Sequence, residues 1–393
     1  MILTLVAPII SASYAFNKVL TGKAKEARAF GSPSRYIQGP GEINNLPKFA
    51  ANYGNTALAI VDSFCYNNYK KKVPLLLEAS GMTCYVVEFS GASSPETLNR
   101  IVAYCKTLPE IPDTFIGIGG GQTCDINKAV GATFRKAFIS VPTSLATDAP
   151  TSTHTIINDP GCMPYLMVHY KNPDYVVVDT EITIGSPIKM LISGIGDALA
   201  TYIEAEASYA NNNVCNAGDG AYKPTRMAMA LAKLSYDILL KKGLEALRAA
   251  KCHARTPAYE DVAEATILLS GLGFECTGVS IAHGLQAGFY VLPNTGLLHG
   301  QGVGYCALIQ LILQDNTERF ARVFDFCHSV GLPVCTKDIG LTDENRKEYV
   351  EKLVDAVYGK RWNVCNMPFY ISRDMLINAI YYLDAYASEH SVQ

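Results

Sequence analysis

Hydrophobic and polar residues follow two different patterns in the two parts of the chain. Between about residues 36 and 179, short runs of aliphatic and β-branched residues alternate with stretches of helical periodicity such as 95–108. The apolar runs are 57–61, 83–87, 114–118, 137–141 and 175–178. Continuous apolar strands separated by helices predict a parallel sheet that is covered by helices on both faces.

The pattern changes after Pro187, where long segments rich in alanine and leucine take over and the strand pattern stops. The predicted helices are 190–208, 225–250, 259–272, 302–313, 317–330, 344–357 and 373–387. We therefore predict three regions: an N-terminal extension (1–33), an α/β domain (34–185) and an all-helical domain (186–393). Ligands of such proteins usually bind in the cleft between domains.

A glycine-rich turn follows the third apolar run, in the sequence Ile116-Gly117-Ile118-Gly119-Gly120-Gly121-Gln122. Glycines let the backbone approach a ligand closely, and the helix that begins here favours an anion such as the pyrophosphate of a dinucleotide. The strict G-x-G-x-x-G pattern is absent because Gln122 replaces its last glycine. Taken alone, the turn is equally consistent with a structural role.

Polar residues follow two other strands of the α/β domain. Asp62 ends the first apolar run, where an acid can accept hydrogen bonds from an adenosine ribose or simply cap the next helix. The segment 142–152 carries Thr143, Thr147, Asp148 and Ser152 at the end of another strand, where open α/β sheets bind ligands. Its hydroxyls can donate hydrogen bonds to a phosphate or an amide, and Asp148 can accept one from a substrate hydroxyl. The alternative is a polar turn that Asp148 caps.

The helical domain contains three candidate metal ligands. Asp197, His283 and His299 each lie among small residues in apolar segments. A single histidine of this kind is more often a core residue, but one carboxylate and two imidazoles together are typical of a Zn²⁺ or Fe²⁺ site with an open position.

Composition narrows the classes of protein. Of 393 residues 49% are hydrophobic and 18% are charged, and the net charge is −3, which argues against disorder and against a nucleic-acid-binding surface. The twelve cysteines are scattered without a C-x-x-C pair, which favours free thiols in a reducing, cytoplasmic compartment. The apolar start, residues 1–16, lacks a preceding basic residue and is too interrupted for a membrane span, so we expect no stable membrane association. An organellar presequence and a flexible extension both remain open for residues 1–33.

The chain resembles the glycerol dehydrogenase family of the metal-dependent, iron-type alcohol dehydrogenases. The resemblance runs from Tyr36 to near the C-terminus, and its motifs are specific as a set. They are the glycine turn with Asp125 and Lys128, Asp148-Ala149-Pro150, Ile195-Gly196-Asp197-Ala198-Leu199-Ala200-Thr201, Gly273-Phe274-Glu275, Ala282-His283, His299-Gly300 and Asn366-Met367-Pro368.

The resemblance implies an α/β dinucleotide-binding domain followed by an all-α domain, as in dehydroquinate synthase-like folds. It implies NAD and one divalent metal, Zn²⁺ more than Fe²⁺, as cofactors, and reversible oxidation of glycerol or a related vicinal diol to dihydroxyacetone by a homo-oligomer. The implied metal ligands are Asp197, His283 and His299, with Asp148 at the substrate. The implied cofactor contacts are Asp62, Gly119, Gly120, Gly121, Asp125, Thr143, Thr147 and Ser152.

Four positions depart from the family pattern. Gln286 and Gln301 replace a common histidine and glutamate, and Gln122 and Ala146 replace a common lysine and serine. Because glutamine cannot relay protons, substrate preference and turnover are expected to differ. The alternatives are another polyol or a glycerol phosphate as substrate, or a non-catalytic scaffold that keeps the cofactor site. No cluster of Arg or Lys surrounds His283 or His299 in the sequence, which counts against a phosphate.

Overall fold

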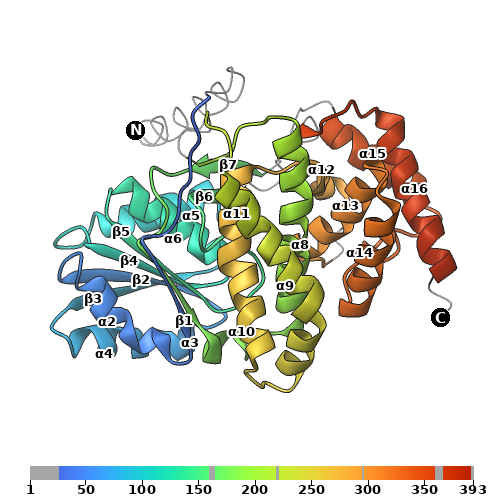
Figure 1. Cartoon of the computed structure of the whole chain (residues 1–393). Helices are drawn as coiled ribbons and strands as arrows, with labels where there is room; N and C mark the ends of the chain where they lie inside the picture. Colours follow the sequence, from blue (N-terminus) through green and yellow to red (C-terminus); the bar gives the residue numbers. More distant parts are fainter. Residues whose placement is uncertain (1–25, 159–163, 218–220, 294–295, 359–365, 391–393) are drawn as a thin grey trace.

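The computed structural model describes residues 26–158, 164–217, 221–293, 296–358 and 366–390. A sheet flanked by helices forms one part of the molecule and a bundle of helices forms the other, with α8–α11 between the sheet and the C-terminal helices (Figure 1). This is the predicted fold class. The predicted domain boundary near residue 185 lies between the last strand and the first long helix, and it stays a prediction.

Six parallel strands form the main sheet in the order β1-β8-β5-β4-β2-β3. They are β1 (Arg35–Gly39), β2 (Thr56–Asp62), β3 (Thr83–Phe89), β4 (Thr114–Gly119), β5 (Ala137–Pro142) and β8 (Tyr175–Asp179). The five predicted strands are confirmed, with ends that differ by one or two residues. Strand β1 was not predicted, because this edge strand is half polar and pairs only with β8 among the described strands.

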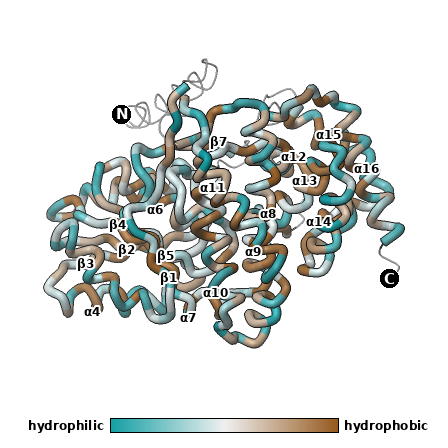
Figure 2. The backbone as a smooth tube through the Cα atoms, in the orientation of Figure 1, coloured by the Kyte–Doolittle hydropathy of each residue, from teal (hydrophilic) through white to brown (hydrophobic). Residues whose placement is uncertain are grey.

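Alternate residues of each strand pack against different helices. On β2, Ala57, Ala59 and Val61 pack with α2 (Leu46–Ala50) and α4 (Lys72–Glu78). Leu58 and Ile60 of the same strand face α5 (Pro95–Cys105) and α6 (Gly121–Thr133). The sheet is therefore covered on both faces, as the continuous apolar runs predicted. Figure 2 shows hydrophobic segments along the central strands and polar ones in the outer turns.

A second sheet was not predicted. In the part of the chain between β5 and β8, strands β6 (His154–Ile157) and β7 (Tyr165–Val168) pair with each other in antiparallel orientation. Each strand has only four residues and no clear alternation of polar and apolar positions, so neither could be predicted from its pattern.

The helical part is built around α8 (Ile188–Ala210) and α13 (His299–Leu313), which are buried along most of their length. Around them lie α9 (Arg226–Lys251), α10 (Pro257–Glu264), α11 (Ser270–Thr277), α12 (Ile281–Gln286), α14 (Thr317–Val330), α15 (Arg346–Tyr358) and α16 (Arg373–His390). The predicted helices are confirmed. The segment predicted as one helix, 259–272, contains a π-helical stretch, Ala265–Leu269, that joins α10 to α11.

Ten cysteines in the described part of the chain are free and most are buried, which agrees with the prediction of free thiols. In the same part, no single helix is long and apolar enough to cross a bilayer. Only one bent pair, Pro257–Thr277 with Ile281–Val291, reaches that length and composition jointly, at an angle of 95°. The N-terminal extension, residues 1–33, for which a presequence and a flexible extension were both open, lies mostly outside the described residues.

Candidate active site

The nucleotide-binding candidates meet where the chain changes direction across the sheet. From β2 the chain moves to β3 on one side and then returns to β4 on the other. Ligands of open α/β sheets bind at such a point, beyond the carboxyl ends of the strands. Asp62 ends β2 and Gly119 ends β4, so the topology places both at this crevice.

The glycine turn is shaped by close contacts. A Cβ on Gly119 would lie 2.4 Å from Thr123 Oγ1, and a Cβ on Gly121 would lie 2.5 Å from Thr147 Cγ2. Around Gly120 there is open space, with no atom within 4 Å of such a Cβ. Gly119 and Gly121 therefore permit tight packing of the turn, whereas Gly120 leaves room for a ligand at the N-terminus of α6.

Asp62 is oriented by the same turn. Its Oδ2 accepts a hydrogen bond from Thr123 Oγ1 at 2.9 Å, and its Oδ1 accepts one from Phe64 N at 2.9 Å. The carboxylate is partly exposed and keeps lone pairs for a further donor. Thr143 donates its N–H to the Gly119 carbonyl at 2.9 Å, which fixes the segment after β5 against the turn.

Asp125 and Ser152 are buried and make contacts within the protein, so their role as cofactor contacts stays a prediction. Asp125 is 4% exposed, pairs with Lys128 Nζ at 2.9 Å and accepts a hydrogen bond from Ile156 N at 3.1 Å. Ser152 is fully buried and accepts from His154 N at 3.3 Å. Lys128, the ion-pair partner of Asp125, also donates to the carbonyls of Ser152 and His154. These contacts connect β6 and the segment before it to α6. Sequence spacing places a residue near a loop but does not fix where its side chain points.

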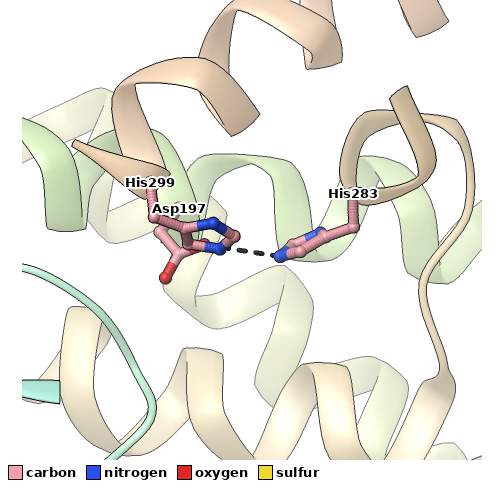
Figure 3. A group of neighbouring side chains, drawn as sticks. All are labelled: Asp197, His283 and His299. Carbon is pink, nitrogen blue, oxygen red and sulfur yellow. Dashed lines mark ion pairs between the residues drawn. The ribbon is translucent and has the colours of Figure 1, made fainter. Parts of the chain in front are cut away.

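Three separate helices bring the predicted metal ligands together. Asp197 lies in α8, His283 in α12, and His299 begins α13. The Nε2 atoms of both histidines lie 3.4 Å from Asp197 Oδ1, and the three candidate ligand atoms lie within 4.8 Å of one another. Figure 3 shows the three side chains pointing toward a common space.

The donor set fits a divalent cation. Asp197 is 1% exposed, yet its Oδ1 has no hydrogen-bond partner among the described residues. Such a buried acceptor is costly unless something satisfies it. One carboxylate oxygen and two imidazole nitrogens match the ligands of Zn²⁺ and Fe²⁺, and the His299 side chain, 47% exposed, leaves one side open.

Glycines explain why these helices come so close. A Cβ on Gly300 would lie 2.0 Å from the Ser193 carbonyl oxygen, so α13 touches α8 backbone to backbone. A Cβ on Gly194 would lie 1.7 Å from the Leu145 carbonyl oxygen, so the segment before Asp148 also touches α8. The small residues beside each candidate ligand are therefore required by packing.

Asp148 lies beside Asp197, and the two acids differ electrostatically. The Asp148 N–H donates to Asp197 Oδ2 at 3.4 Å, and Ser270 Oγ donates to Asp148 Oδ2 at 2.5 Å. Burial and the nearby charge of Asp197 raise the pKa of Asp148 well above its ordinary value. Burial opposes ionisation of Asp197 too, but the imidazoles of His299 and His283 lower the pKa of Asp197 below its ordinary value.

A cavity of about 350 Å³ opens next to His299. Its described lining is apolar and aromatic apart from a few polar groups: Gln286, Phe289, Tyr290, Leu292, Pro293, Gly296, Leu297, Leu298 and His299. Gln286, one of the departures from the family pattern, thus faces this space. Gln301 instead caps the N-terminus of α13, since its Oε1 accepts a hydrogen bond from Leu298 N at 3.0 Å.

Sequence reasoning missed one residue of the site, Glu204. This buried carboxylate accepts hydrogen bonds from the ring and the backbone N–H of His283. Its only signal in the sequence is its place two helical turns after Asp197, on the same side of α8.

Comparisons with known proteins show the family of the chain. The family model for iron-containing alcohol dehydrogenases matches residues 33–180. The glycerol dehydrogenase of Citrobacter freundii is 35% identical over 89% of this chain and 95% of its own length, and that of Thermotoga maritima is 37% identical over 82% and 88%. A probable glycerol dehydrogenase from Sinorhizobium meliloti superposes with a TM-score of 0.86 at 31% identity, covering 92% of this chain and all of its own. The chain therefore belongs to the glycerol dehydrogenase family of iron-containing alcohol dehydrogenases and is an enzyme of that class.

Proposed function

We propose that this enzyme oxidises glycerol, or a closely related vicinal diol, to dihydroxyacetone with NAD⁺, reversibly, in a reaction that requires one Zn²⁺ ion. The observation that carries the proposal is the unpartnered, buried Oδ1 of Asp197 with two imidazole Nε2 atoms 3.4 Å away. The relatives named glycerol dehydrogenase support the choice of substrate. We further propose that the protein works in the cytoplasm as a homo-oligomer.

In this proposal the residues of the site divide into two groups. Asp197, His283 and His299 hold the cation, and the N-terminus of α6 with Gly120 receives the pyrophosphate of the cofactor. When bound, the cation supplies a Lewis acid that eases deprotonation of a substrate hydroxyl, and NAD⁺ accepts the hydride. Asp62 accepts from the ribose hydroxyls, and its negative charge disfavours the 2′-phosphate of NADP.

Asp148 positions the substrate in this scheme. Ser270 Oγ holds one carboxyl oxygen of Asp148, which leaves the other to face a diol hydroxyl. Because Asp148 is buried beside Asp197, its hydrogen bond with the substrate would form where no bulk water competes.

The cavity lining supports a neutral substrate over a glycerol phosphate. None of the described residues that line the cavity beside His299 is Lys or Arg. A phosphate bound there would therefore have no Lys or Arg side chain from this lining to pair with.

The test is a substrate panel on protein reconstituted with Zn²⁺ or Fe²⁺, followed by NADH absorbance. Vicinal diols with NAD⁺ should give the highest kcat/KM, and glycerol phosphates and NADP⁺ the lowest. Asp197→Ala should lose both the bound metal and the turnover, while its NAD⁺ affinity stays within about twofold of wild type. A metal-free wild type with full activity, or activity confined to phosphorylated substrates, would refute the proposal.

A further inference from the structure

Glu204 occupies a special position relative to the candidate metal ligands. It lies in α8 seven residues after Asp197 and is fully buried, although a charged residue is almost never buried without partners. Its carboxylate faces the N-terminus of α12, the helix that carries His283.

Every contact of the Glu204 carboxylate is with a donor. Oε1 accepts from Ser280 N at 2.8 Å and from His283 N at 2.9 Å, and Oε2 contacts Nδ1 of the His283 ring. The two backbone N–H groups can only donate, and a carboxylate that accepts from both of them can also accept an N–H at Nδ1 of the ring. The charge also complements the N-terminal end of α12.

The contact with the ring fixes its tautomer. A neutral imidazole carries one N–H, and an acceptor at Nδ1 places that hydrogen there and leaves the Nε2 lone pair free. The free Nε2 is the atom that lies 3.4 Å from Asp197 Oδ1. Carboxylates that hold histidine ligands in this way orient the ring and increase its basicity.

We infer that Glu204 is a positioning residue that sets the His283 tautomer for metal binding, beyond its role as a cap for α12. The inference rests on the proposed metal site. In this inference, α8 carries one metal ligand, Asp197, and also Glu204, which sets the tautomer of a second ligand, His283.

Gln310 of α13 offers a matched control. Its Oε1 accepts from Ala282 N at 3.2 Å and from Ser280 Oγ at 2.8 Å, and its Nε2 donates to the Ile203 carbonyl at 3.0 Å. Gln310 therefore anchors the same helix terminus from a buried position, but none of these contacts involves the ring of His283.

The test compares Glu204→Gln with Gln310→Met. The introduced amide can still accept a backbone N–H through its oxygen, but its NH₂ group faces Nδ1 and favours the tautomer protonated at Nε2. We expect Glu204→Gln to bind Zn²⁺ about 10- to 100-fold more weakly in chelator competition. Its Co²⁺ complex should also have an altered visible absorption spectrum. Gln310→Met should lower the melting temperature of the metal-free protein and keep the wild-type Zn²⁺ affinity.

The outcomes separate this inference from the proposed function. Equal Zn²⁺ binding by the wild type and Asp197→Ala would remove the metal site and the inference with it. Zn²⁺ binding that depends on Asp197 but is unchanged in Glu204→Gln would overturn only the inference. Equal loss of affinity in Glu204→Gln and Gln310→Met would also overturn it, because both would then act only through the stability of α12. Should Glu204→Gln not fold, Glu204→Asp, which keeps the charge but shortens its reach to Nδ1, replaces it in the same comparison.

Discussion

Glu275 of α11 should make the stability of this enzyme fall as pH rises. The side chain is fully buried, and its carboxylate accepts from Thr153 Oγ1 at 2.9 Å, Thr153 N at 3.3 Å and Asn172 Nδ2 at 2.6 Å. Burial raises the pKa of Glu275 to about 7 from 4.5, although these hydrogen bonds and Lys128 oppose the change. Glu275→Gln keeps the shape of the side chain and removes its titration.

The direction and the size of this pH effect follow from the proton affinities of Glu275 in the folded and the unfolded state. The folded state binds the proton more tightly than the unfolded state, so this contribution to stability is complete below pH 4.5 and is lost as pH rises through 7. Each tenfold difference in proton affinity corresponds to about 1.4 kcal/mol, so the total for Glu275 is about 3 kcal/mol. Most of the loss falls between pH 5 and pH 7.

The assay is the melting temperature of wild type and Glu275→Gln between pH 5 and pH 8.5, at constant ionic strength and metal content. The wild type should lose stability relative to the variant across this range, with the difference levelling off above pH 8. Glu245→Gln, at a residue that is 61% exposed, is the control and should follow the wild type. Parallel curves for wild type and Glu275→Gln would refute the reasoning, because the buried carboxylate would then titrate alike in both states.

Four other substitutions test packing and the cofactor turn. Gly300→Ala should cost ~1–3 kcal/mol of stability and lower Zn²⁺ occupancy, measured by melting and metal analysis, because its Cβ would overlap the α8 backbone; unchanged occupancy would contradict the packing argument. Lys128→Met should cost about 3–5 kcal/mol in denaturant unfolding, because it leaves the buried carboxylate of Asp125 without its ion-pair partner; a loss below 1 kcal/mol would show that this pair is dispensable. Gly120→Ala should keep the melting temperature and raise the KM for NAD⁺. Gly119→Ala should instead lower the melting temperature, because its Cβ would contact Thr123. The reverse result would show that NAD⁺ does not bind in the space beside Gly120.

The parts of the fold that the sequence predicted are those with a strong periodic pattern. Residues 57–61 are buried whichever face of the sheet their side chains point to, and this environment explains why the run is apolar throughout. By contrast, β1 forms from Arg-Tyr-Ile-Gln-Gly, and its pairing with β8 depends on a segment about 140 residues later in the chain. Short half-polar strands of this kind are defined by their neighbours and not by their own composition.

The candidate site divides in the same way. Asp197, His283 and His299 stand out because polar, metal-binding side chains interrupt apolar helical segments. Asp125 follows the glycine turn and Ser152 lies in the segment after β5, but both side chains are buried, and the contact of Asp125 with Ile156 depends on where β6 packs. Glu204 required the approach of α12 to α8 before it could be connected with a histidine 79 residues later.

A single face of α8 links the metal ligands to the substrate acid. Gly194, Asp197, Thr201 and Glu204 follow one another at intervals of three, four and three residues, which confines them to an arc of about 80° on the helix. Gly194 admits the segment that leads to Asp148, and Thr201 Oγ1 lies 2.8 Å from Ser270 Oγ, which in turn donates to Asp148. Because the same face carries Asp197 and Glu204, a shift of α8 would move the metal ligand and the supports of both His283 and Asp148 together. In the proposed function this helix would set the relative placement of cation and substrate, and substitutions on this face should change metal affinity and the KM for the diol together.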